Sequence, residues 1–367
     1  MKNTFGNSLS ITLFGESHGP YVGAVLDGLA PGIPIDDAYI RSQLALRRPY
    51  GKISTGRVEE DAYEIVSGVY EGKTTGTPLC ILIANTAMKS SDYEKERLIR
   101  PGHADYTAHC KYHGFEDYRG GGHFSGRITA ALVAAGAIAR YALEKKGVVI
   151  GTHILKLHEL RDRTFDDLAA DIAYLNKQTF PVFSEEVRDA MISAIEEAAS
   201  QGDSLGGVLE TAVTGMDAGI GEPWFDSVEG VLSHMLYSIP AVKGVEFGVG
   251  FDGCALRGSS YNDALRVEDG KVVTVSNHNG GINGGITNGM PILFCCAIKP
   301  TPSIYKEQES IDLAAMTNQT IAIQGRHDPA IIHRARSVVD AATALALYDL
   351  LAMRYGTDYF GIVSNNK

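Results

Sequence analysis

Arg119-Gly-Gly-Gly-His-Phe-Ser-Gly-Arg127 is the stretch around which this chain is organised. Three consecutive glycines add no side chain to packing and lose the most backbone entropy on folding, so they indicate a close approach of the backbone to something else. The Ala-, Leu- and Ile-rich run that follows, up to Lys146 and Gly147, predicts a long helix. A glycine turn before a helix start presents N–H donors and the positive end of the helix dipole. The stretch therefore predicts an anion site, and an ordinary loop-to-helix corner is the alternative.

The bulk composition is that of a globular protein: 367 residues, 44% hydrophobic and 21% charged. No apolar run approaches the roughly 20 residues of a membrane span, and the N-terminus has no apolar secretory segment. Five scattered cysteines form no CxxC pair, which favours reduced thiols in the cytoplasm. The net charge of −11 argues against nucleic acid or an anionic membrane as partner. Arginines in motif-like stretches nevertheless predict a basic pocket for a small polyanion, with the acidic surplus elsewhere, as in Glu59-Glu-Asp61.

Apolar periodicity predicts a mixed α/β (α+β) chain. Strands are expected over 8–14, 22–26, 63–69, 79–84, 148–157, 206–215, 242–250 and 291–298. Helices are expected over 37–48, 127–146, 184–200, 225–238 and 331–354, the first of them capped by Asp36-Asp37. The Gly- and Asn-rich run 277–289 is expected to be a loop. No linker divides the chain, so residues 1–367 are expected to form one compact domain.

His18 is the first candidate for proton transfer, because histidine exchanges protons near neutral pH. It stands in Gly15-Glu-Ser-His-Gly-Pro20, where the flanking glycines let a ligand approach closely. A turn histidine that bonds its own backbone is the alternative.

His103 is the second candidate. It lies between Pro101-Gly102 and Asp105, an arrangement suited to an acid that protonates a leaving oxygen. His109 and His113 stand one helical turn apart and leave open a metal site with His103 and Asp105, although no Glu follows His109 in the HExxH sense.

Two further loops combine stiff backbone with polar groups. Lys299-Pro-Thr-Pro-Ser303 follows an apolar strand, and a simple strand-to-loop exit is the alternative. Arg326-His-Asp328 sets a cation two residues from a carboxylate. In a dry pocket Asp328 could act as a base or orient one, and a surface ion pair is the alternative.

Side by side, these stretches resemble the chorismate synthase family, in the family's order and over essentially the whole chain. The motifs that carry the resemblance are Gly15-Glu-Ser-His-Gly19, Arg100-Pro-Gly-His-Ala-Asp-Tyr-Thr107, Arg119 to Arg127, Gly202-Asp-Ser-Leu-Gly206, Ala241-Val-Lys-Gly244 and Gly325-Arg-His-Asp-Pro329. The resemblance implies a β-α-β sandwich, a cytoplasmic homotetramer and a lyase of the shikimate pathway, in aromatic amino acid biosynthesis. Its reaction would be the anti-1,4 elimination of phosphate from 5-enolpyruvylshikimate 3-phosphate to give chorismate. The implied cofactor is reduced FMN (FMNH2), with NADPH acting only indirectly through a separate flavin reductase.

The resemblance also implies roles for single residues. His18 would protonate or hydrogen-bond the reduced flavin, His103 would protonate the departing phosphate, and Asp328 would help to deprotonate flavin N5. The implied substrate-binding residues are Arg47, Arg48, Lys52 and Arg127. The implied flavin contacts are His123, Phe124, Ser125, Pro240, Ala241, Gly284, Lys299, Pro300, Thr301, Pro302, Ser303 and Arg326, and no metal is implied. The chain departs from the family at His123-Phe124-Ser125, where many members have Arg-Ser-Ser or Arg-Ala-Ser.

Two other classes of function stay open at this point. One is a metal-dependent phosphoester hydrolase built on His103, Asp105, His109 and His113. The other is a phosphometabolite-binding module without chemistry. Chelator sensitivity and a response to reduced FMN distinguish the three.

Overall fold

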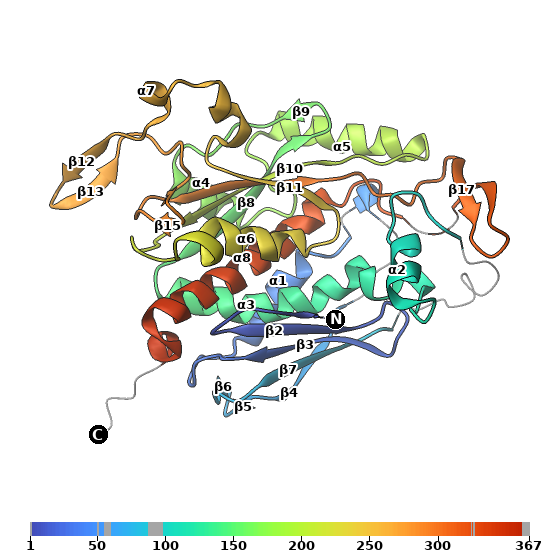
Figure 1. Cartoon of the computed structure of the whole chain (residues 1–367), viewed down its shortest axis with the longest axis horizontal. Helices are drawn as coiled ribbons and strands as arrows, with labels where there is room; N and C mark the ends of the chain where they lie inside the picture. The colour runs from blue at the N-terminus through green and yellow to red at the C-terminus, as the bar shows by residue number, and fades with distance from the viewer. Residues whose placement is uncertain are drawn as a thin grey trace.

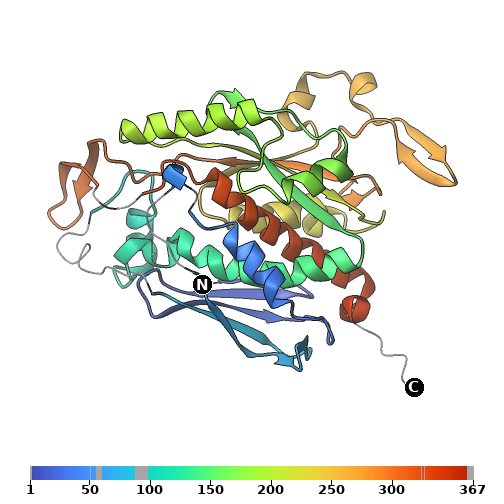
Figure 2. The same cartoon turned by 180° about the vertical axis from the view of Figure 1, so that it is seen from behind.

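Two antiparallel sheets enclose a layer of helices in the computed structural model of this chain (Figures 1 and 2). The structure describes residues 2–49, 51–54, 60–86, 98–323, 325 and 327–361, with the side chain of Lys52 outside the description. This order of sheet, helices and sheet is the predicted β-α-β sandwich of an α+β protein.

The first sheet lies at the bottom of Figure 1 and has the order β1-β2-β3-β7-β4. Its strands are β1 (Thr4–Phe5), β2 (Ser10–Gly15), β3 (Tyr21–Asp27), β7 (Leu79–Ala84) and β4 (Tyr63–Ser67). Every pairing is antiparallel, with Leu13 opposite Ala24 and Val25 opposite Cys80. β7 alternates buried and less buried residues because one face of the sheet packs against helices.

The second sheet lies on the other side of the helices and has the order β11-β16-β10-β8-β9. Its strands are β11 (Val242–Phe247), β16 (Ile292–Ile298), β10 (Gly207–Thr214), β8 (Val149–Leu157) and β9 (Leu160–Arg161). These pairings are also antiparallel. β8 is buried along almost its whole length, so this sheet is covered on both faces.

The helix layer is formed by α1 (Asp37–Ala45), α3 (Thr129–Lys145), α6 (Val228–Tyr237) and α8 (Ile332–Tyr355). α3 and α8 are buried on nearly every face because they pack against each other and against a sheet on each side. Gly136 allows this approach, since a Cβ there would lie 2.5 Å from the Cβ of Ala341. The buried apolar residues of all three layers form one cluster. This cluster supports the single domain, which stays a prediction.

Further helices and hairpins lie around the two sheets and the helix layer. The other helices are α2 (Asp105–Tyr112), α4 (Leu168–Leu175), α5 (Glu185–Ser200) and α7 (Gly258–Tyr261). The hairpins are β5 (Val69–Tyr70) with β6 (Lys73–Thr74), β12 (Leu265–Glu268) with β13 (Lys271–Thr274), β14 (Ile282–Asn283) with β15 (Ile286–Thr287), and β17 (Gln308–Asp312) with β18 (Thr317–Ile321). Figure 1 shows α2 and β17 near one end of the molecule and the β12–β13 hairpin projecting at the other.

Most predicted elements are confirmed within a few residues, and the differences have local causes. The helix expected over 225–238 begins at Val228, because Ser227 caps it by accepting a hydrogen bond from the N–H of Gly230. The helix expected from residue 127 begins at Thr129, after short 3-10 turns over Arg119–Phe124 and Gly126–Ile128. The loop predicted over 277–289 contains the β14–β15 hairpin. Asp36 does cap α1, through the N–H of Tyr39.

The prediction about membrane spans needs one correction. Gly126–Lys145 does have the length and mean hydropathy of a spanning helix, because alanine, leucine and isoleucine dominate it. In the fold 89% of its apolar window is buried inside the protein. That burial is the environment of a core helix.

Candidate active site

The three glycines of the opening stretch form a turn between two histidines. Gly120, Gly121 and Gly122 all have positive φ, of 59°, 85° and 53°. A Cβ on Gly120 would lie 2.6 Å from Nε2 of His18, and one on Gly121 would lie 3.3 Å from Nε2 of His103. The turn is therefore glycine because histidine rings from two distant segments pack against its backbone.

The side chain of His103 is oriented by Asp105. Asp105 Oδ1 lies 2.8 Å from His103 Nδ1, and the same carboxylate accepts hydrogen bonds from Nε, Nη2 and the backbone N–H of Arg100 at 2.7–2.9 Å. Burial raises the pKa of Asp105, but hydrogen bonds and charge from Arg100 and His103 outweigh it and hold that pKa well below its usual range. An ionised Asp105 accepts a hydrogen bond from Nδ1–H, and Nε2 is the ring nitrogen nearer to Gly121.

Two buried arginines share one carboxylate on the other side of the turn. Asp61 accepts hydrogen bonds from Nη1 of Arg47, at 2.6 Å, and from Nη1 of Arg127. Arg47 also donates to Thr129 Oγ1 and to the carbonyl of Gly126. Burial lowers the pKa of Arg47 to about 10, against the opposing effect of Asp61, so it keeps its charge at neutral pH. The prediction that Asp61 belongs to an acidic surplus away from the basic pocket is therefore wrong.

Two adjoining cavities open beside these groups. The smaller, of about 290 Å³, is lined by Arg47, Arg48, Asp61, Arg100, Arg127, Asp328 and Arg334, together with Gly120 and apolar residues that include Ile331 and Val338. The larger, of about 790 Å³, has a more apolar wall that includes Phe124, Ile128, Leu132, Ile239 and Ile331. Gly120, Ser125, Pro240 and Asp328 line both, so the two cavities meet at the glycine turn and at Asp328.

Comparison with known proteins decides the family. The family model described as chorismate synthase matches residues 9–352. A chorismate synthase of Korarchaeum cryptofilum is 45% identical over 348 residues, which cover 94% of this chain and 96% of that protein. One of Pyrococcus abyssi is 44% identical over 95% of this chain and 97% of its own.

The chain belongs to the chorismate synthase family.

A solved structure agrees. A crystal structure of a chorismate synthase superposes with a TM-score of 0.76 at 28% sequence identity, covering 96% of this chain and 94% of that one. Family membership makes this protein a lyase that acts on a phosphate-bearing small molecule.

Most of the residues that the resemblance to chorismate synthases implied are brought together. Arg47, Arg48 and Arg127 line the smaller cavity. The larger cavity is lined by His103, His123, Phe124, Ser125, Pro240, Ala241, Lys299, Thr301, Pro302 and Ser303. Lys299 Nζ also donates to the carbonyl of Gly102, which ties the 299–303 loop to the loop of His103.

Three of the implied residues stand apart from both cavities. Among the described residues, His18, Gly284 and Pro300 line neither cavity. His18 lies beneath Gly120, whereas Gly284 sits in the β14–β15 turn, near the start of α6 rather than the end that leads to Pro240. Arg326 lies outside the described residues, as does the side chain of Lys52.

The structure does not bring together the four residues of the possible metal site, His103, Asp105, His109 and His113. His109 Nδ1 lies 3.7 Å from Glu116, and His113 ends α2 in the left-handed conformation. Within the described ranges there is no group of three or more His, Cys, Asp or Glu side chains placed to hold a metal ion.

Sequence reasoning missed three polar residues at the site: Asp61, Asn85 and Arg334. Asn85 Oδ1 accepts from Nε of Arg127 at 2.8 Å, and Arg334 Nη1 donates to Asp328 Oδ2 at 2.5 Å. Asp61 and Asn85 are both tens of residues from Arg127 in the sequence, so no spacing rule would have found them. Arg334, six residues after Asp328 at a helix start, was within reach of such a rule.

Proposed function

We propose that this chain catalyses the anti-1,4 elimination of phosphate from 5-enolpyruvylshikimate 3-phosphate to give chorismate and inorganic phosphate. The substrate would occupy the smaller cavity and reduced FMN the larger. The observation that carries this proposal is that one carboxylate, Asp328, lines both cavities. An acceptor in that position can take a proton at the boundary between substrate and cofactor.

The charge of the smaller cavity supports this substrate. Among its lining residues, five arginines face two aspartates, an excess of three positive charges. The substrate bears a phosphate and two carboxylates, and guanidinium groups bind such anions through paired hydrogen bonds. Arg47, Arg48 and Arg127 would bind and orient it.

The larger cavity suits a flavin. Its volume lies within the usual range for ligand sites, and it combines apolar side chains with polar groups at Lys299 and Ser303. Thr301 Oγ1 is buried and has no hydrogen-bond partner in the part of the chain that the structure describes. Reduced FMN bound here would supply the transient electron density for C–O cleavage that no side chain can provide.

Two side chains would move the protons. Of the two cavities His103 lines only the larger, so the phosphate of the substrate would lie at the glycine turn, where the two cavities meet. Because Asp105 holds Nδ1–H of His103, we propose that Nε2 of the protonated ring gives its proton to this phosphate as the C–O bond breaks. Asp328 would help to remove the proton lost from the ring carbon by deprotonating flavin N5, so one proton is taken up and one is delivered. For His18, hydrogen bonding to the reduced flavin stays a prediction, supported by its contact with Gly120 at the border of both cavities.

The proposal also includes the oligomeric state, the compartment and the source of reduced flavin. We infer from family membership a cytoplasmic homotetramer that receives reduced flavin from a separate reductase, with NADPH as the indirect electron source. Light scattering would measure the assembly. Turnover with NADPH and FMN that starts only when a reductase is added would support the second inference.

Anaerobic turnover tests the reaction. With photoreduced FMN and 5-enolpyruvylshikimate 3-phosphate, chorismate should appear together with one equivalent of phosphate. The absorbance of the flavin should change when the substrate is added. A chelator should not slow turnover. Phosphate release without chorismate, abolished by chelator, would instead identify a metal-dependent hydrolase, and binding without any turnover would identify a binding module.

A further inference from the structure

The first turn of α8 holds two parts of the site at once. Arg334 Nη1 donates to Asp328 Oδ2 at 2.5 Å, and its Nε donates to the backbone carbonyl of Arg47 at 2.6 Å. Next to it, His333 Nε2 lies 2.8 Å from Ser54 Oγ. One turn of helix therefore contacts the Arg47–Ser54 segment at both ends and also the carboxylate that lines both cavities.

The contact with Arg334 helps to orient the carboxylate of Asp328. Asp328 lies in an irregular segment just before α8, so it belongs to no strand ladder or helix. The side chains of Arg334 and Asp328 are 22% and 14% exposed, which shields their ion pair from most of the solvent. Arg334 itself lines the smaller cavity, beside Arg47 and Arg127.

The guanidinium group is suited to this double contact. Its plane fixes the directions of Nε and Nη1, so bonding both acceptors sets the carboxylate of Asp328 relative to the backbone of Arg47. A lysine would keep the charge in the cavity, but its single flexible ammonium could not reproduce the two fixed directions.

We propose that Arg334 is a positioning residue for the elimination, a role that rests on the proposed function above. It sets the distance and angle between the proton acceptor Asp328 and the arginines that hold the anionic substrate. The positive charge of Arg334 also offsets the negative charge of Asp328, so that this carboxylate does not repel the anionic substrate. Arg334 thus has two separable effects, one of geometry and one of charge.

Steady-state kinetics separates the two effects. In Arg334→Lys the charge remains, so KM for the substrate should stay within about threefold of wild type while kcat falls about tenfold or more, as expected when reacting groups are displaced by a fraction of an ångström. In Arg334→Gln the charge is lost as well, and KM should rise in addition. A wild-type kcat in Arg334→Lys would overturn the proposal.

A double-mutant cycle tests whether Arg334 acts through Asp328. In an Asp328→Asn background, Arg334→Gln should change kcat less than about threefold, because the group that it positions is already disabled. Fully additive losses would overturn the proposal. If Arg334→Gln does not fold, Arg334→Lys takes its place in the cycle.

His333→Gln is the matched control. It removes the neighbouring contact of the same helical turn, to Ser54, and should show no coupling to Asp328→Asn. The same KM and kcat pattern in His333→Gln would mean that any loosening of the turn has this effect, and would overturn a specific role for Arg334. Absence of chorismate with the wild-type enzyme would overturn the proposed function and this role together, whereas wild-type turnover with additive losses overturns this role alone.

Discussion

Gly120 and Gly121 show how one atom can decide the arrangement of a site. Both have positive φ, and a histidine ring from another segment lies 2.6 Å from where the Cβ of Gly120 would be and 3.2 Å from where that of Gly121 would be. The glycine run is therefore needed for two reasons, backbone conformation and the space taken by His18 and His103. Gly147 provides a comparison, because it has a φ of 84° but no atom within 4 Å of the position of its Cβ.

We expect Gly120→Ala to be more destabilising than Gly147→Ala. Each substitution carries the cost of a left-handed alanine, about 1–2 kcal/mol. Only Gly120→Ala adds overpacking against His18, typically about 1–3 kcal/mol more. Urea unfolding measures both. Turnover should fall in Gly120→Ala alone, and equal losses of stability would contradict the packing argument.

Asp105 is the residue on which the reactivity of His103 depends. Asp105→Asn keeps the shape but replaces a carboxylate acceptor with an amide, so Nδ1–H of His103 loses its orienting charge. A general acid typically raises the rate by a factor of about 10²–10⁴. We expect Asp105→Asn to lose part of this factor, so that kcat falls about tenfold or more. Flavin affinity, measured by fluorescence quenching, should change little. His109→Gln, one turn along the same helix, is the control, and an equal fall there would contradict the assignment.

At the scale of elements, the start of α8 is built around a buried neutral histidine. His333 is 2% exposed, stacks on Phe180 and lies beside Ser54. Burial, reinforced by the charge of Arg334, lowers the pKa of His333 to about 3. The element that supports the site is therefore sensitive to acid.

The sign of this effect follows from proton binding. Between about pH 6.5 and pH 3 the unfolded chain binds a proton at residue 333 and the folded chain does not. The free energy of unfolding should therefore fall with decreasing pH, with a contribution from this residue of up to about 1.4 kcal/mol per pH unit. His333→Gln should show a shallower decline between pH 7.5 and 5.5, measured by urea unfolding. Parallel curves would contradict this expectation.

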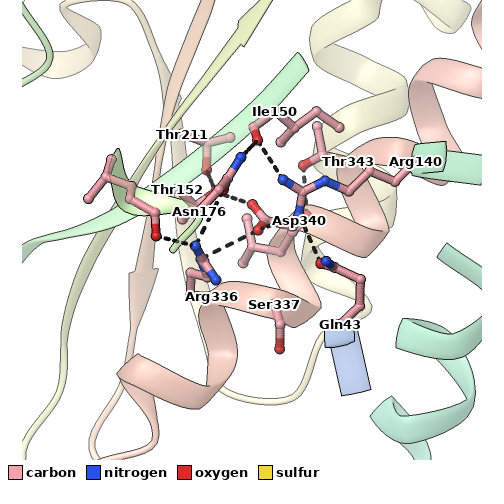
Figure 3. Close-up of polar contacts among 12 residues, drawn as sticks. Gln43, Arg140, Ile150, Thr152, Asn176, Thr211, Arg336, Ser337, Asp340 and Thr343 are labelled. Atoms are coloured by element: carbon pink, nitrogen blue, oxygen red, sulfur yellow. Dashed lines mark hydrogen bonds and ion pairs between the residues drawn. The ribbon is translucent and has the colours of Figure 1, made fainter. Parts of the chain in front are cut away.

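At the scale of the whole molecule, a buried network of charges joins the helix layer to the second sheet (Figure 3). Asp340 of α8 accepts from Arg140 of α3 at 3.0 Å and from Thr152 of β8 at 2.6 Å. Arg336 approaches the same carboxylate at 3.5 Å, and Arg140 also donates to the carbonyl of Ile150. Because these groups lie among apolar residues, they specify one alignment of helices and sheet.

Removing the charge of Asp340 should therefore be costly. Asp340→Asn removes the anion that Arg336 and Arg140 share. Arg140 keeps its ion pair with Glu144, but the loss of one partner of a buried ion pair typically costs about 3–5 kcal/mol. The matched control is Asp203→Asn, which breaks an ion pair with Lys306 that is 40–46% exposed and should cost no more than about 1 kcal/mol. Urea unfolding at pH 7 compares the two. Similar losses would show that the buried network has no special role.

The sequence-based predictions are accurate where the cause of a feature lies nearby in the chain. The strand over Leu79–Ala84 and the cap at Asp36 were predicted because their causes lie within a few residues of chain. The predicted start of α3 is two residues too early, because a glycine-rich approach does not reveal where regular hydrogen bonding begins. The prediction for Asp61 is wrong because nothing in the sequence around an acidic residue indicates which arginine it will bind.

By itself, the sequence determined the core helices, the longer strands of both sheets and the family, since these depend on periodicity and on motifs within continuous stretches. Only the tertiary structure decided that His18 and His103 contact one glycine turn, that Asp61 joins Arg47 to Arg127, and that Asp328 meets Arg334 beside both cavities. The physical reason is that a site is made by side chains from distant segments. Their distances are set by how the sheets and helices pack, and no local pattern contains that information.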